Sequence, residues 1–193
     1  MKDYNVVIIS GSDSDLPHIK KIQEELDKYT IESNIRICSA HKQPVACENI
    51  IRELNESSTP SVIVSIAGAT DALSGVLSFH SVHPVISCPP DKNNYFSCVD
   101  NPPGSSNSLI LRPANVAKHI AQMLALVNPD FKKIIIEKNK QKITEELMAL
   151  AKESILTQEI DTILYHKSFP VDIRHNSKIF REKLTTWAEA RVR

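Results

Sequence analysis

Two short segments of the sequence combine side chains that could hold a sugar phosphate and transfer a proton. The first, residues 10–15, reads SGSDSD and supplies one glycine, three hydroxyls and two carboxylates in succession. Glycine lets a ligand approach the backbone, the hydroxyls and the free amides of a helix start can hold a phosphate, and Asp15 can accept from sugar hydroxyls. The spacing is neither the GxGxxG dinucleotide fingerprint nor a Walker loop, so an ordinary capped turn is the alternative.

The second segment, residues 39–44, reads SAHKQP and sets a histidine beside a fixed cation. An imidazole titrates near neutral pH, which makes His41 the natural candidate for moving a proton on a bound substrate. Lys42 could bind the phosphate of the same ligand. A purely structural histidine is the alternative for His41.

A third segment, residues 67–75 with the sequence AGATDALSG, is rich in small residues. Gly68 and Thr70 suit a loop that closes over a compact ligand. We expect Asp71 to be a solvated loop carboxylate, and we interpret residues 101–106 (NPPGSS) as a further turn on the ligand side. The histidines and the four cysteines lack metal-ligand spacing and no GxSxG elbow occurs, so we expect no metal site and no serine hydrolase.

The elements that must position these segments alternate between short apolar runs and helical patterns, which is typical of a parallel sheet covered by helices. Strands are predicted at residues 5–10, 34–39, 61–67, 84–87 and 108–111, and helices at residues 16–29, 45–55 and 113–127. The predicted fold class is α/β, a flavodoxin-like doubly wound parallel sheet in a three-layer sandwich. Ligands of such sheets bind beyond the carboxyl ends of the strands, where the three segments described above would converge. The second predicted strand is expected to be buried.

A helical C-terminal extension follows the sheet. We predict a first domain over residues 1–130 and an extension over residues 131–193, with one long or two abutting helices at 131–163, a loop at 164–176 and a short final helix. A helix this long beside a small sandwich usually packs on something, so we expect contacts between subunits.

Composition excludes several classes of protein. Of 193 residues, 41% are hydrophobic and 24% are charged, which is ordinary for a globular protein and unlike a disordered one. The 23 basic and 23 acidic residues balance, so we expect neither a nucleic-acid nor a membrane partner. No apolar run reaches the ~20 residues of a membrane span and no signal-peptide pattern is present, which predicts a cytoplasmic protein with reduced, packed cysteines.

In this order and spacing, the first two segments resemble those of the aminoimidazole ribonucleotide carboxylase family of purine biosynthesis. The family's early loop is GSxSD, present here at residues 11–15, and its second loop is SAH, a basic residue, one more position and a proline, present here at residues 39–44. The similarity covers roughly residues 4–127. It implies a homo-oligomer, an octamer, with small-molecule ribonucleotide and CO2 as ligands and no ATP, biotin or metal cofactor.

Within that family the chain resembles the branch that takes CO2 directly, which has lysine after the histidine and the string PVISCPP. This chain has Lys42 and reads PVISCPP at residues 84–90. The resemblance assigns His41 as the acid/base. It assigns the binding of the ribose phosphate to Ser12, Asp15, Ser39 and Lys42. It assigns the pocket for the carboxyl group or CO2 to Gly68 and Thr70.

Two alternatives stay open at this point. The mutase branch rearranges N5-carboxyaminoimidazole ribonucleotide, and it usually has arginine after the histidine and a further histidine in the third loop. A non-catalytic nucleotide-binding relative is the other alternative, because the turn at residues 102–104 reads PPG where the family commonly has PSG or PGG. The last segment, residues 169–188, lies outside the family's core and faintly resembles the tails of some acyl-adenylate-forming enzymes.

Overall fold

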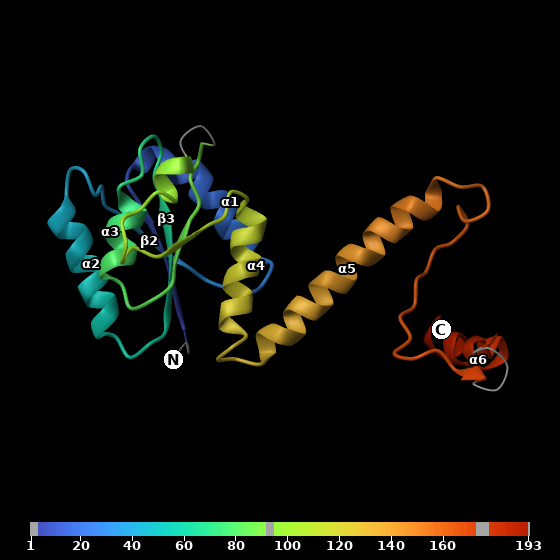
Figure 1. Ribbon diagram of the computed structural model, residues 1–193. Coiled ribbons are helices and arrows are strands. Elements are labelled where there is room, and N and C mark those ends of the chain that lie inside the picture. Colours follow the sequence, from blue (N-terminus) through green and yellow to red (C-terminus); the bar gives the residue numbers. More distant parts are fainter. Residues whose placement is uncertain (1–3, 92–94, 173–177, 193) are drawn as a thin grey trace. The chain divides into compact units, whose positions relative to one another are not determined.

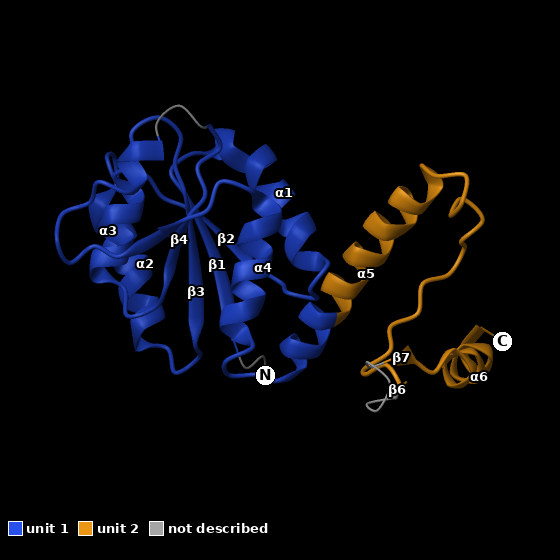
Figure 2. Ribbon diagram, turned by 45° about the vertical axis from the view of Figure 1, so that its right-hand side comes forward, with its two compact units in different colours: residues 1–136 blue, residues 137–193 orange. Residues whose placement is uncertain are grey.

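The computed structural model describes residues 4–91, 95–172 and 178–192, and its chain divides into two compact units. Unit 1 is Met1–Ile136 and unit 2 is Glu137–Arg193 (Figure 2). No helix within the described ranges is both long and apolar enough to cross a membrane.

Unit 1 is built on a sheet of five strands that are all parallel. The strands are β1 (Asn5–Ser10), β2 (Asn34–Ile37), β3 (Ser61–Ile66), β4 (Val85–Ser87) and β5 (Asn107–Leu109). Their order across the sheet is β2-β1-β3-β4-β5. This is the doubly wound, flavodoxin-like order, so the predicted fold class is confirmed.

Helices cover both faces of this sheet. Figure 1 shows α1 (Leu16–Asp27) and α4 (Pro113–Leu124) on one side, and α2 (Pro44–Glu56) and α3 (Leu73–His80) on the other. Two short 3-10 turns, η1 (Asp13–Asp15) and η2 (Tyr95–Cys98), lie in the connections after β1 and β4. The result is the predicted three-layer sandwich.

The alternation of side chains along β1 produces two hydrophobic cores, one for each face of the sheet. Val6 and Ile8 pack into the core shared with α1 and α4, whereas Val7 and Ile9 pack into the core shared with α2 and α3. Successive residues of a strand point to opposite faces, so a central strand that is apolar throughout must be covered on both sides. Burying each such side chain stabilises the fold by roughly 1.5–3 kcal/mol.

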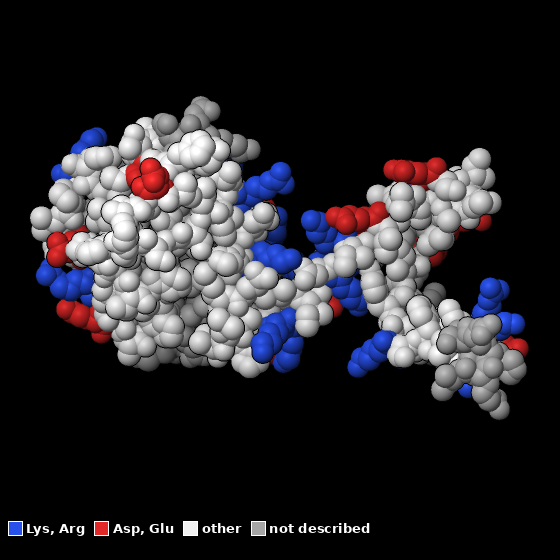
Figure 3. All heavy atoms as spheres, in the orientation of Figure 1, with Lys and Arg blue, Asp and Glu red and all other residues white. Residues whose placement is uncertain are grey.

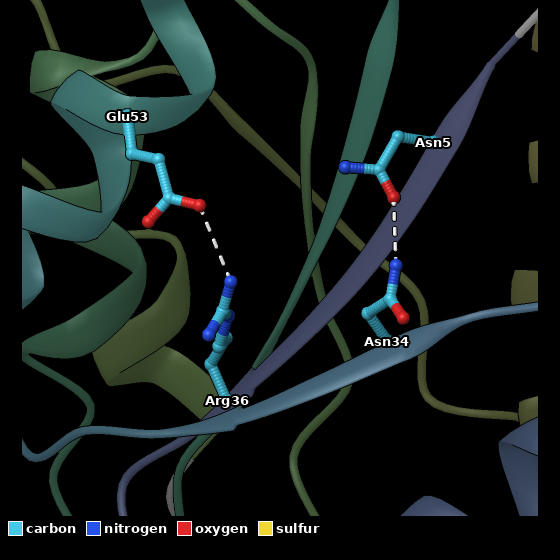
Figure 4. A network of polar contacts seen from close by, with 4 residues as sticks. All are labelled: Asn5, Asn34, Arg36 and Glu53. Atoms are coloured by element: carbon cyan, nitrogen blue, oxygen red, sulfur yellow. Dashed lines mark hydrogen bonds and ion pairs between the residues drawn. The ribbon is translucent and has the colours of Figure 1, made fainter. Parts of the chain in front are cut away.

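Strand β2 lies at the edge of the sheet and is exposed along its whole length, so the expectation of a buried strand was wrong. Polar side chains attach it to its neighbours instead (Figure 4). Asn34 donates to the Oδ1 atom of Asn5 in β1 at 3.1 Å, and Arg36 contacts Glu53 of α2 at 3.2 Å. The apolar sequence of this strand predicted its conformation, but only the strand order placed it at an edge.

Helix α3 was not predicted: residues 73–75 were interpreted as the end of the third loop, and residues 76–80 were assigned no element. It runs from Leu73 to His80 and buries Leu73, Ser74 and Leu77. The segment is short and lacks the polar face that makes amphipathic helices recognisable in a sequence. The third predicted loop therefore ends at Ala72, and Gly75 is a helical residue.

One long helix, α5 (Asp130–Lys152), begins in unit 1, and most of its residues belong to unit 2. The predicted continuation of this helix to residue 163 was wrong, since residues 153–159 form turns and residues 160–165 have no regular structure. A short antiparallel pair, β6 (Val171–Asp172) and β7 (Lys178–Ile179), precedes the final helix α6 (Arg181–Val192). Residues 173–176 of the loop predicted at 164–176 lie outside the described residues.

Candidate active site

The carboxyl ends of the three strands on the β2 side of the sheet are joined by backbone hydrogen bonds. The amide of Cys38, just after β2, donates to the carbonyl of Ser10 at 2.7 Å, and the amide of Gly11 donates to the carbonyl of Ile66 at 3.0 Å. These bonds bring the loops that follow β1, β2 and β3 to a single edge of the sheet.

A cavity of about 350 Å³ lies between these three loops. Its lining includes six of the seven residues to which the sequence assigned a role: Ser12, Asp15, Ser39, His41, Gly68 and Thr70. It also includes residues to which no role was assigned: Gly11, Ser14, Ala40, Ala67, Ala69 and Leu73. Hydroxyls, one carboxylate and one imidazole therefore face the same small volume.

Lys42 is the one candidate that does not line the cavity. It is exposed and follows His41 in a tight turn, in which the amides of Lys42 and Gln43 donate to the carbonyl of Ser39 at 3.2 and 2.7 Å. Pro44 then begins α2, where its missing amide costs no hydrogen bond. The turn directs the chain from the end of the strand into the helix and leaves the lysine beside the cavity lining.

Asp15 is buried, with 8% of its surface exposed, and it is held by a hydrogen bond from the end of β1. The hydroxyl of Ser10 lies 2.9 Å from Oδ2 of Asp15 and 3.0 Å from the carbonyl oxygen of Ser12. A buried carboxylate needs such a donor to offset its loss of hydration. This contact fixes Asp15 while the cavity retains it as an acceptor for ligand hydroxyls.

The hydroxyls of the first loop are organised around Ser12. Its Oγ accepts a hydrogen bond from the amide of Ser14 at 3.2 Å and from the hydroxyl of Ser14 at 2.8 Å. Ser14 also lines the cavity, although the family resemblance assigned it no role. The serine repeat in SGSDSD was the sequence signal for this additional hydroxyl.

His41 is exposed and lines the same cavity as Ser12. Its imidazole comes from the loop after β2, and the hydroxyl of Ser12 comes from the loop after β1. A ligand that contacts the first loop is therefore within the same enclosed space as the one imidazole among the lining residues. This is the arrangement that general acid/base chemistry on a small bound ligand requires.

Asp71 is buried, at 5% exposure, so the expectation of a solvated carboxylate was wrong. Its Oδ1 accepts a hydrogen bond from the amide of Ser74 in the first turn of α3 at 2.8 Å, and its own amide donates to the hydroxyl of Ser97 in η2 at 2.9 Å. The carboxylate satisfies a free amide at the start of the helix, as N-terminal acidic groups commonly do. Asp71 thus secures the end of the third loop.

The described part of unit 1 also has other hollows. One of about 530 Å³, larger than the cavity above, is lined by residues 109–122 of β5 and α4, including Arg112, Lys118 and His119. Figure 3 shows basic side chains near α4 and a scattering of both charges elsewhere on this face of unit 1. The smaller cavity is the better candidate because it alone of the two joins three loops at carboxyl ends of parallel strands.

Another hollow, of about 360 Å³, contains the PPG turn. Asn101, Pro102 and Ser105 line it together with Phe79 of α3, and none of them lines the candidate cavity. The side-chain amide nitrogen of Asn101 (Nδ2) donates a hydrogen bond to the Oδ1 atom of Asn107 at 2.8 Å. This turn therefore supplies no lining residue to the candidate cavity, and Pro102 lies beside α3 instead.

His18, in the first turn of α1, is a half-buried histidine to which the sequence analysis assigned no role. Its Nε2 lies 3.1 Å from the carbonyl oxygen and 3.4 Å from the Sγ of Cys88, which follows β4. Burial lowers the pKa of His18 below 6.5, and the hydrogen bond to Cys88 opposes this effect. The imidazole links α1 to the end of β4.

The four cysteines are free and buried, in agreement with their interpretation as packed thiols. Burial raises the pKa values of Cys88 and Cys98 to about 12, and burial together with the adjacent Cys38 does the same for Cys47. These three thiols are therefore protonated near neutral pH and poor nucleophiles.

Comparison with known proteins agrees with this geometry. The sequence model of the AIR carboxylase family matches residues 5–145. A phosphoribosylaminoimidazole carboxylase of Treponema denticola is 35% identical over 149 residues, which are 73% of this chain and 94% of that protein. A phosphoribosylaminoimidazole carboxylase of Archaeoglobus fulgidus is 34% identical over 144 residues, which are 72% of this chain and 79% of that protein.

A bifunctional phosphoribosylaminoimidazole carboxylase/phosphoribosylaminoimidazole succinocarboxamide synthetase of Mus musculus is 38% identical over 128 residues, but the matched part is only 30% of its length. The crystal structure of Treponema denticola PurE superimposes with a TM-score of 0.67 at 34% identity, covering 72% of this chain and 92% of that one. The match of the family model over most of unit 1, together with the shared fold, shows that this chain belongs to the AIR carboxylase family.

Proposed function

We propose that this protein catalyses the reversible carboxylation of 5-aminoimidazole ribonucleotide by CO2 to 4-carboxyaminoimidazole ribonucleotide. The observation that carries the proposal is one cavity, at the ends of β1, β2 and β3, that Ser12, Asp15 and His41 line together. The names of the relatives in Treponema denticola and Archaeoglobus fulgidus support the same activity.

Binding of the ribonucleotide is assigned to the first two loops. Ser12 and Ser39 offer hydroxyls to the phosphate, and Asp15, already fixed by Ser10, accepts from the ribose hydroxyls. Lys42 is exposed beside the cavity, where a long flexible side chain can swing toward a bound phosphate. Gly68 and Thr70 shape the wall for the carboxyl group.

The reaction follows from these positions. The electron-rich carbon of the aminoimidazole ring attacks CO2, a carbon–carbon bond forms, and one C–O electron pair moves onto an oxygen. The ring carbon then carries both a proton and the new carboxylate. His41 takes the proton, its C–H electron pair returns to the ring, and aromaticity is restored. In reverse, protonated His41 donates to the ring carbon and CO2 leaves.

We favour direct carboxylation over the mutase reaction because Lys42 follows His41, residues 68–75 contain no histidine, and residues 84–90 read PVISCPP. The test supplies aminoimidazole ribonucleotide with bicarbonate, with and without carbonic anhydrase. Product that forms without the N5-carbamate, and faster when carbonic anhydrase speeds CO2 supply, supports the carboxylase. Product formation only from the N5-carbamate would establish the mutase.

Replacement of His41 by Asn separates catalysis from binding. We expect His41→Asn to lower kcat by about 10²–10⁴-fold while the ribonucleotide still binds, since the phosphate and ribose contacts come from other side chains. Isothermal titration and steady-state kinetics measure the two effects. A parent protein that binds the ribonucleotide without turnover would instead establish the non-catalytic alternative.

We further propose a cytoplasmic, nucleotide-binding homo-oligomer, an octamer as the family resemblance implies. Support comes from α5, which leaves Ile136, Ile143, Leu147 and Leu150 at least 42% exposed. Such apolar surface is typical of protein interfaces.

Light scattering coupled to size-exclusion chromatography measures the molar mass of the oligomer. Ile143→Glu should reduce this mass, whereas Lys142→Glu at the neighbouring exposed position should not. A parent protein that is monomeric at micromolar concentration would refute the oligomer.

A further inference from the structure

The cavity wall formed by residues 67–70 contains a backbone position that needs external support. Ala69 has a φ of +55°, in the left-handed region that residues other than glycine rarely adopt. Among the non-glycine residues that the structure describes, only Thr30 shares a positive φ. Since the methyl side chain of alanine makes no hydrogen bond, contacts from other segments must stabilise this conformation.

One such contact comes from Asp91, which follows β4 after two consecutive prolines. Its Oδ2 accepts a hydrogen bond from the amide of Ala69 at 3.3 Å. The same Oδ2 and the ring of Pro90 each lie 3.8 Å from the point that a Cβ on Gly68 would occupy. The segment after β4 is therefore in contact with the strained part of the wall.

The first loop approaches the same position. Oδ1 of Asp15 also lies 3.8 Å from the Cβ point on Gly68. Gly68 is thus close to both Asp15, which the hydroxyl of Ser10 fixes, and Asp91, and the hydrogen bond to the segment comes from Asp91. Asp71, at the end of the wall, is held separately by Ser97 and α3. A change at Asp91 would therefore be transmitted to Gly68 and Thr70, which line the cavity.

We infer that Asp91 is a positioning residue: by holding Ala69 in the left-handed conformation, it fixes the wall where the carboxyl group is gained or lost. Its kinetic consequence rests on the proposed carboxylase function, whereas its structural consequence does not. Asp91 is not among the residues that line the cavity, so we assign its effect to its contact with Ala69. Sequence gave no sign of it, because 22 residues separate the two partners.

The kinetic test compares variants of the full chain. We expect Asp91→Ala to lower kcat about tenfold or more, with the KM for the ribonucleotide within about twofold, because the phosphate and ribose contacts belong to other loops. Asp91→Asn keeps an oxygen acceptor and should retain kcat within about threefold. Asp100→Ala, at an exposed carboxylate of the same β4–β5 connection, is the matched control and should match the parent.

A double variant tests the mechanism of the effect. Glycine adopts the left-handed region without strain, so Ala69→Gly should restore part of the kcat that Asp91→Ala loses. If Asp91 acted through its charge, Ala69→Gly would restore nothing and Asp91→Asn would lose as much as Asp91→Ala. Either of these results would overturn the inference, as would a raised ribonucleotide KM with unchanged kcat.

A structural measurement keeps the inference independent of turnover. The three-bond coupling between the amide and Hα protons of Ala69 reports its φ by NMR. We expect this coupling to change in Asp91→Ala and to stay at the parent value in Asp91→Asn and Asp100→Ala. An unchanged coupling in Asp91→Ala would overturn the inference even in an active enzyme, and a parent without carboxylase activity would refute the proposed function alone.

Discussion

The polar side chains of the cavity differ in how firmly the fold holds them, and this difference determines what each can contribute. Asp15 is buried and bonded to Ser10, so its orientation is set before a ligand arrives. His41 is exposed and free to exchange protons with a ligand and with water. Lys42 is exposed and outside the lining, so its proposed role requires that a bound phosphate order its side chain.

Removal of the Lys42 cation should weaken ribonucleotide binding more than it slows the chemistry. We expect Lys42→Ala to raise the KM for the ribonucleotide about ten- to hundredfold, equivalent to ~1.5–3 kcal/mol for a charge-assisted contact, with kcat much less affected. Lys42→Arg should recover most of the affinity, and Lys20→Ala on exposed α1 serves as the control. An unchanged KM would reject the role assigned to Lys42.

His18 should make the fold less stable in acid. Burial, the largest cause, lowers its pKa in the folded protein below 6.5, so the unfolded chain binds the proton more readily. Stability from this group is therefore complete above pH 6.5 and decreases as the pH falls through the lowered pKa. Urea unfolding between pH 5 and about 8 should show a smaller acid loss for His18→Gln than for the parent. Equal acid losses would contradict this account.

At the scale of the elements, the short helix α3 and the loop before it depend on one another. Asp71 ends the loop that carries Gly68 and Thr70, and it bonds to the first turn of the helix. Asn101 leaves no space for a side chain in the first turn of α3, because its Oδ1 is 2.7 Å from the point that a Cβ on Gly75 would occupy. The conformation of the third loop therefore depends on the start of α3 being correctly formed.

Substitution of Asp71 tests this dependence. Asp71→Ala removes the acceptor for the Ser74 amide and should lower the free energy of unfolding by about 1 kcal/mol, together with kcat. Asp71→Asn keeps an acceptor oxygen and should restore most of both. Denaturant unfolding and steady-state kinetics measure the pair. A variant with a lower free energy of unfolding but the kcat of the parent would show that the start of α3 does not determine the conformation of the cavity wall, and it would contradict the expected coupling.

At the scale of the whole molecule, unit 1 contains complete cores of its own. Every buried member of its two cores lies between Val6 and Phe131, and Ile134 and Ile135 of α5 pack at their margin. The candidate cavity is likewise built entirely from residues 11–73. Unit 2 contributes none of these residues.

Deletion of residues 153–193 should therefore leave unit 1 folded. We expect its free energy of unfolding to change by less than about 1 kcal/mol, and the ribonucleotide KM to stay within about twofold, because no core or cavity side chain is removed. The comparison uses urea unfolding and steady-state kinetics of the shortened and full chains. Loss of cooperative unfolding on deletion would show that unit 1 depends on the tail.

The type of sheet, the presence of all five strands and the three loops that form the cavity could be predicted from the sequence. Apolar runs and turn residues act locally, so they identify strands and loops directly. Six of the seven candidate residues share one cavity because the carboxyl ends of parallel strands must lie at one edge of the sheet. The roles of these residues remain predictions.

The features that depend on which segments pack together became visible in the folded chain alone. The strand order exposed β2, packing formed the unpredicted helix α3 and buried Asp71, and the β4–β5 connection brought Asp91 to Ala69. None of these contacts leaves a periodic signal in the chain, because the partners are far apart in sequence and their choice follows from burying the two cores as a whole.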